Sequence, residues 1–154
     1  MAVHIKNCVL AAMAAVGTFI ANALGGWDAA MKLLVAMMAV DYITGWLVAA
    51  VWHRSPKSVS GALNSNAGFK GLCKKGAILL VVWIGTMLDS TYGGAYIRTA
   101  VILFFIGNEG LSVLENLGLM GVPYPKFLNK MLEALQEQGD KGSSTLPESE
   151  ANDE

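Results

Sequence analysis

Hydrophobic residues in this chain come in long blocks rather than in the narrow stripes of a soluble amphipathic helix. Residues 5–24 form one nearly unbroken apolar block, and residues 29–52 form a second that ends near Trp46 and Trp52. About 20 apolar residues in a helix suffice to cross the hydrocarbon core of a bilayer. The two blocks therefore predict two membrane-spanning helices, joined by a tight turn at residues 25–28.

The first block also has features of a secretory signal peptide, because Lys6 precedes it and residues 21–23 read Ala-Asn-Ala, like a cleavage site. The length of the block, and the second block directly after it, favour a retained membrane helix.

Two shorter apolar blocks, residues 76–88 and 97–107, span a bilayer only if they are extended to about 74–92 and 96–119. The last extension includes a polar stripe. At about 100° per residue the stripe covers roughly a third of the helix circumference. Its members are Asn108, Glu109, Ser112, Glu115 and Asn116. Acidic groups at membrane depth are costly and usually functional.

The pattern predicts an all-α integral membrane protein, with a transmembrane domain over residues 1–122 that contains about four spanning helices. Three crossings are the alternative, in which residues 76–88 and 97–107 do not both cross fully. Residues 123–138 predict an amphipathic helix of about 20 Å, too short to span. It suits the membrane interface, a neighbouring subunit or an ordinary surface position. The acidic, Ser-rich residues 139–154 predict a disordered tail.

Charge is segregated along the chain although its formal net value is only -1. The link over residues 53–73, together with the two lysines after it, contains only basic charged residues. These are Arg54, Lys57, Lys70, Lys74 and Lys75. The positive-inside rule makes this basic loop cytoplasmic and attracted to lipid headgroups, and with four crossings both termini are also cytoplasmic. The acidic tail argues against nucleic-acid binding.

The composition supports a membrane protein and offers no catalytic machinery. Hydrophobic residues make up 54% of the chain and charged residues 15%, with a mean hydropathy of +0.47. No hydrolase, metalloprotease, dinucleotide or P-loop motif is present. Cys8 and Cys73 form neither a disulfide framework nor a metal-binding spacing. We therefore expect no enzymatic activity, cofactor or metal.

The remaining chemistry is a set of polar and small residues in apolar helices. Asp41 lies near the middle of the second span, and Gly45 and Ala49 follow it as a ridge that allows close helix approach. Polar groups at this depth hold helices together or line water, and water lining requires an oligomer. The candidates for oligomerisation or pore lining are Asp41, Gly45, Asn108, Glu109, Ser112, Glu115 and Asn116. At the external turn, Asp89 and Arg98 are expected to form an ion pair.

Several motifs within residues 35–135 resemble those of the bacteriophage holin family of phage-lysis and toxin-secretion proteins. The specific part is Asn-Glu-Gly-Leu-Ser-Val-Leu-Glu-Asn at residues 108–116, followed by Gly121-Val122-Pro123 and Pro125. The weaker part comprises Asp41-Tyr42-Ile43-Thr44-Gly45, Ser58, Ser60, Gly68, Gly71 and Lys74-Lys75. The first helix and the acidic tail carry none of these motifs.

This resemblance implies a multi-pass protein of the host bacterial cytoplasmic membrane that oligomerises into lesions. A phage endolysin, or in some relatives a toxin, crosses through them. The implied partners are further copies of the chain, the bilayer, an endolysin that it does not bind directly and an antiholin. Two other function classes stay open. They are a small ion channel or transporter component that uses Asp41 and Glu109, and a structural membrane scaffold.

Overall fold

The computed structural model describes residues 1–53, 55 and 64–143, and every regular element in this part of the chain is a helix. The α-helices are α1 (Ala2–Ala23), α2 (Ala29–Leu47), α3 (Ser65–Tyr92), α4 (Tyr96–Leu119) and α5 (Phe127–Ser143). A short π-helix, η1 (Val48–Trp52), continues α2. The predicted all-α fold is confirmed.

Among the described residues, 4 helical segments are long and apolar enough to cross a membrane. They are Val3–Ala23, Ala29–Trp52, Ser65–Tyr92 and Tyr96–Leu119. This number agrees with the prediction of four spans rather than with the alternative of three. The chain is thus a multi-pass membrane protein by the length and composition of its helices.

The two largest differences from the predicted helix boundaries are at the start of α3 and at the end of α5. α3 begins at Ser65 instead of residue 74, because the Asn64 side chain accepts a hydrogen bond from the Asn66 backbone N–H at 2.9 Å and caps the helix there. Residues 65–73 are therefore helical rather than part of the basic loop. α5 likewise continues to Ser143, through the start of the expected disordered tail. The rest of that tail, residues 144–154, lies outside the described residues.

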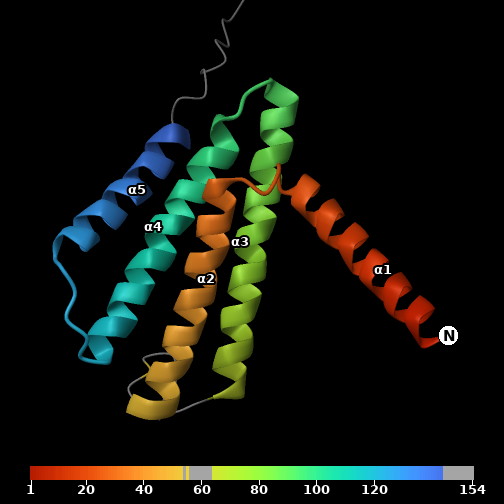
Figure 1. The fold of residues 1–154 in the computed structure, drawn as a ribbon. Coiled ribbons are helices and arrows are strands. Elements are labelled where there is room, and N and C mark those ends of the chain that lie inside the picture. The colour runs from red at the N-terminus through yellow and green to blue at the C-terminus, as the bar shows by residue number, and fades with distance from the viewer. Residues whose placement is uncertain (54, 56–63, 144–154) are drawn as a thin grey trace, which may run out of the picture.

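α2, α3 and α4 pack together as a bundle, and α1 projects away from it (Figure 1). The buried apolar core lies between these three helices and the α1–α2 turn. It consists of Leu24, Met31, Leu34, Met38, Ile78, Val82, Ile102 and Ile106. α1 is exposed at every residue from Val3 to Ile20, so its apolar side chains are available to lipid rather than packed in the core.

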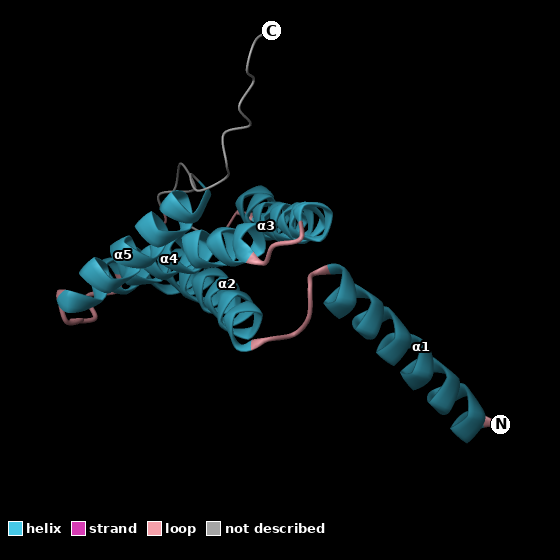
Figure 2. Ribbon diagram, turned by 90° about the horizontal axis from the view of Figure 1, so that it is seen from above, coloured by secondary structure: helices cyan, strands magenta, loops and turns pink. Residues whose placement is uncertain are grey.

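α4 is the central helix, in contact with α2, α3 and α5. α5 runs back along α4 in the antiparallel direction, and Figure 2 shows it at the edge of the bundle, beyond α4. Two glycines bring the two backbones close. A Cβ atom on Gly107 would lie 2.6 Å from the Leu132 carbonyl oxygen, and one on Gly139 would lie 2.6 Å from the Ala100 carbonyl oxygen. The amphipathic helix therefore packs on its own chain, a position that the sequence left open.

Arg98, in the first turn of α4, holds the α1–α2 turn. Its Nε donates a hydrogen bond to the Leu24 carbonyl at 2.6 Å, and one terminal nitrogen pairs with the Asp28 carboxylate at 2.6 Å. The other terminal nitrogen donates to the Gly26 carbonyl at 3.1 Å. Asp28 also caps α2 by accepting the Met31 backbone N–H at 2.8 Å. These contacts tie the start of α2 to the start of α4.

The expected ion pair between Asp89 and Arg98 is wrong. The Asp89 carboxylate instead accepts the backbone N–H groups of Ile97 and Arg98, each at 2.9 Å. These N–H groups belong to the first turn of α4 and have no partner within that helix. Asp89, from the last turn of α3, therefore caps α4 and leaves the Arg98 guanidinium to Asp28.

The ion pair between Asp28 and Arg98 predicts a pH dependence of stability. The hydrogen bond from Arg98 holds the pKa of the Asp28 carboxyl below its ordinary value of 3.8, and the Met31 N–H adds to this effect. A carboxyl with a lowered pKa stabilises the fold fully above its ordinary pKa, and the contribution is lost as pH falls through the lowered value. The Asp28→Asn variant, which keeps a cap oxygen, should be less stable than the wild type near neutral pH.

This difference between the wild type and Asp28→Asn should shrink as pH falls below the ordinary pKa of 3.8 and vanish once pH has fallen through the lowered pKa of Asp28. Thermal unfolding in detergent between pH 2.5 and 7 measures it. A constant difference across the whole range would show that the charge pair does not stabilise the turn.

The close packing of α5 on α4 predicts a marked sensitivity at Gly107. Gly107→Ala places a methyl group against the Leu132 backbone and should destabilise the protein by about 1–3 kcal/mol through overpacking. Gly76→Ala is the matched control, since no atom lies within 4 Å of its added Cβ. That control should be neutral or stabilising, as alanine favours helix by about 1 kcal/mol. Equal stability of the two variants in a thermal melt would contradict the observed helix contact.

Candidate functional site

A cluster of charged side chains is buried where α2, α3 and α4 meet. Lys75 of α3 donates hydrogen bonds through Nζ to Oδ2 of Asp41 on α2, at 2.8 Å, and to Oε2 of Glu109 on α4. All three residues are buried, with relative exposures of 8% for Lys75, 6% for Asp41 and 1% for Glu109. One cation thus joins two carboxylates across three helices.

Asn116 and Thr44 extend this arrangement by one helical turn. The Asn116 amide nitrogen donates to Oδ1 of Asp41 at 3.2 Å and to the hydroxyl oxygen of Thr44 at 3.0 Å. The Thr44 hydroxyl in turn donates to the Val40 carbonyl at 2.8 Å. Gly45 leaves room for the amide, because a Cβ there would lie 3.6 Å from the Asn116 nitrogen. We call Asp41, Thr44, Lys75, Glu109 and Asn116 the polar cluster.

The polar cluster is stable only as a unit. Ionised, its one lysine and two carboxylates carry a formal charge of +1 - 2 = -1. Charges removed from water cost several kcal/mol each unless they are paired and hydrogen-bonded. Over the described residues, no buried side-chain nitrogen or oxygen lacks a hydrogen-bond partner. The cluster can therefore fix the relative positions of three helices in an environment without water.

The structure divides the predicted polar stripe of α4 into two parts. Glu109 and Asn116 are separated by two helical turns and both enter the polar cluster with Asp41. Asn108 and Ser112 are half-buried, and Glu115 is exposed. The ridge residue Gly45 faces α4 of its own chain. Among the described residues, no group of three or more His, Cys, Asp or Glu side chains could hold a metal ion.

The expectation that Lys75 belongs to a basic membrane surface is wrong. Its ammonium group is in the polar cluster, whereas Lys70 and Lys74 are exposed on α3. Arg54 and Lys57 lie outside the described residues. The sequence did indicate a buried basic partner, because two acidic residues were predicted at membrane depth with no cation assigned to them. It was missed because the helix was expected to begin only at residue 74.

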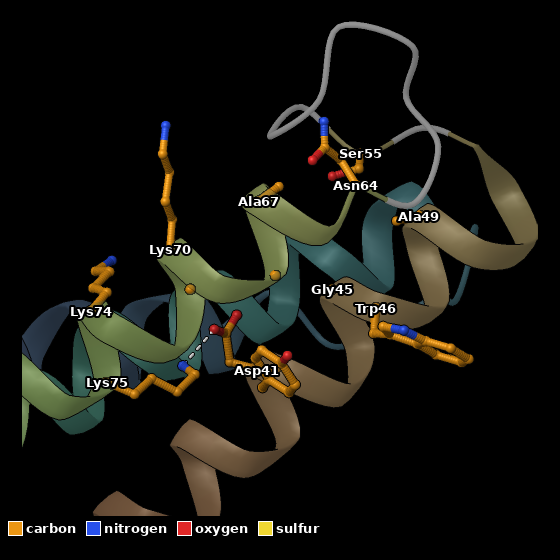
Figure 3. Close-up of a pocket in the computed structure, with 13 residues that line it drawn as sticks. Asp41, Gly45, Trp46, Ala49, Ser55, Asn64, Ala67, Lys70, Lys74 and Lys75 are labelled. Carbon is orange, nitrogen blue, oxygen red and sulfur yellow. Dashed lines mark hydrogen bonds and ion pairs between the residues drawn. The ribbon is translucent and has the colours of Figure 1, made fainter.

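A cavity of about 310 Å³ lies beside the polar cluster, between α2 and the first half of α3. Tyr42, Gly45 and Trp46 line it from α2, and Asp41 and Lys75 line its inner end. Figure 3 shows Lys75 directed towards Asp41, while Lys70 and Lys74 extend away from that carboxylate. The cavity therefore marks where the polar cluster comes nearest to the outside of the bundle.

Removal of the shared cation should break the polar cluster. Lys75→Met leaves Asp41 and Glu109 buried together without a cation, and we expect a loss of about 3–5 kcal/mol of stability. Lys74→Met is the matched control, because Lys74 is exposed and should change stability by less than about 0.5 kcal/mol. Unfolding of both variants in detergent micelles measures the difference. Equal midpoints would contradict a structural role for Lys75.

Comparisons with known proteins identify the family. The model of the bacteriophage holin family matches residues 18–137, which include the polar cluster. An uncharacterized protein of Clostridium perfringens is 35% identical over 135 residues, which cover 86% of this chain and 94% of the relative. A probable holin of Bacillus phage phi105 is 29% identical over 112 residues, covering 72% and 77%. No solved structure matches. The chain thus belongs to the bacteriophage holin family.

Proposed function

We propose that this protein is a phage holin, which oligomerises in the bacterial cytoplasmic membrane and forms lesions that release an endolysin. The family match over residues 18–137 carries this proposal, together with the similarity to the phage phi105 protein. The family is one of membrane proteins rather than enzymes. An endolysin would pass through the lesion without being bound, and an antiholin would act as a regulatory partner.

We assign the polar cluster to holding α2, α3 and α4 together as one unit within a subunit. Its hydrogen bonds support this use over water lining, because Asp41, Glu109 and Asn116 all contact partners in their own chain. The outer members of the stripe remain available for contacts between subunits. These are Asn108, Ser112 and Glu115.

The proposed orientation follows from the basic residues at one end of the bundle. Lys70 and Lys74 are exposed near the start of α3, and this end is assigned to the cytoplasm by the positive-inside rule. The α1–α2 turn and Arg98 then lie on the outer side, and the N-terminus is cytoplasmic. α5 returns along α4 and brings Gly139 close to Ala100. The end of α5 therefore lies towards the outer side, whereas the C-terminus, which was expected on the cytoplasmic side, lies outside the described residues.

Expression in a bacterium with and without a cytoplasmic muralytic enzyme tests the function. A holin should cause lysis only when the enzyme is present, because the lesion must pass a folded protein. An ion channel would depolarise the membrane without releasing the enzyme, and a scaffold would do neither. Passage of a cytoplasmic reporter enzyme across the membrane and the membrane potential should be followed together. Depolarisation with no enzyme release would overturn the proposal.

The same assay bears on the alternative of a toxin-secretion holin from a bacterial or prophage locus. This alternative draws support from relatives in bacteria, such as the Clostridium perfringens protein and a Listeria innocua protein that is 38% identical over 109 residues. Release of a folded cargo without wall digestion would favour that role.

A further inference from the structure

α5 is the described helix with the most charged outer surface. Its half-buried residues Leu128, Leu132 and Leu135 lie on one side of the helix, and the side chain of Leu132 meets Gly110 of α4. Its exposed side carries charge along its length. The exposed charged residues are Lys130, Glu133, Glu137 and Asp140, which we call the α5 wall.

The α5 wall lies beside the apolar half of a membrane-spanning helix. The added Cβ of Gly139 would contact Ala100 and Phe104, and that of Gly107 would contact Leu132 and Gln136. α5 therefore follows α4 from about residue 110 back to residue 100, a distance of about 15 Å along the axis. If α4 crosses the bilayer, the α5 wall lies at the depth of the hydrocarbon core.

The other outer surfaces of the bundle have the opposite character. Exposed apolar side chains on α2 include Leu33, Val40 and Ile43, and those on α3 include Leu80 and Ile84. α1 is exposed along its length and lies on the far side of the bundle from α5 (Figure 2). These apolar surfaces are suited to contact with lipid. Charged side chains at the same depth are costly in lipid, so they face protein or water.

We propose that the α5 wall lines the water enclosed by an assembly of copies of this chain. Each copy would turn α5 inward and its α1 and α3 surfaces towards lipid. This inference rests on the proposed holin function, which requires an oligomer with an aqueous path. It identifies α5, rather than the polar stripe of α4, as the surface in contact with that water. The polar cluster then stays intact when the lesion forms.

Nitroxide labels in reconstituted protein test where the α5 wall lies. The full chain carries Cys8→Ser and Cys73→Ser, since both native cysteines are exposed. One variant adds Glu133→Cys on the α5 wall, and the matched control adds Ile84→Cys on the apolar surface of α3. Both are assembled in phosphatidylglycerol and phosphatidylethanolamine vesicles. Relaxation by a water-soluble nickel chelate is compared with relaxation by oxygen, which concentrates in lipid.

We expect the label at position 133 to relax several-fold more with the nickel chelate than the label at position 84, and the oxygen effect to be reversed. A label at position 133 that responds mainly to oxygen would overturn the proposal, because the α5 wall would then face lipid.

A second measurement excludes an α5 that has left the bundle and lies in bulk water. Labels at Thr99→Cys and Asp140→Cys, both exposed positions near the contact of Gly139 with Ala100, report the separation of the two helices. Packed helices have axes about 8–10 Å apart, so a short and narrow distance distribution is expected. A long or broad distribution would overturn the proposal. Failure of the lysis assay with both label results intact would instead reject the holin function alone.

Discussion

The bundle depends on one lysine that pairs with two buried carboxylates where three helices meet. The Lys75 ammonium group donates to both carboxylates, and Asp41 and Glu109 would each be costly to bury without it. The lysine therefore fixes the positions of α2 and α4 along α3. The apolar side chains of Met38, Ile78 and Ile106 fill the bundle around this contact, but apolar packing alone does not specify a single register.

α4 is fixed at both of its ends, by different chemistry at each. Arg98 binds the α1–α2 turn through carbonyl oxygens and Asp28, and Asn116 binds Asp41 near the opposite end. The two attachments are separated by five turns of helix, about 27 Å. Such a helix can neither slide nor rotate against α2 unless both sets of hydrogen bonds break. The remaining face of α4 packs against α5, where Gly107 and Gly110 allow close approach.

Much of the fold follows from the sequence because span length and hydropathy are local properties. The four spans, and the occurrence of Asp41 and Glu109 within them, could be read from residue spacing. The partners could not. Which cation meets Asp41, and whether Arg98 turns to Asp28 or Asp89, depends on the order in which helices pack side by side. An amphipathic pattern also shows that α5 has an apolar face without showing which helix it meets.

α1 has the least structural constraint of the described helices. From Val3 to Ile20 it is exposed throughout, and the family match begins only at residue 18. No neighbouring side chain imposes a shape on this segment, so its role depends on length and apolar composition instead of fit. Most exchanges among leucine, valine, isoleucine and methionine here should be silent. The sequence of this helix is therefore constrained by its length and average apolarity, whereas position 75 is constrained by specific contacts with Asp41 and Glu109.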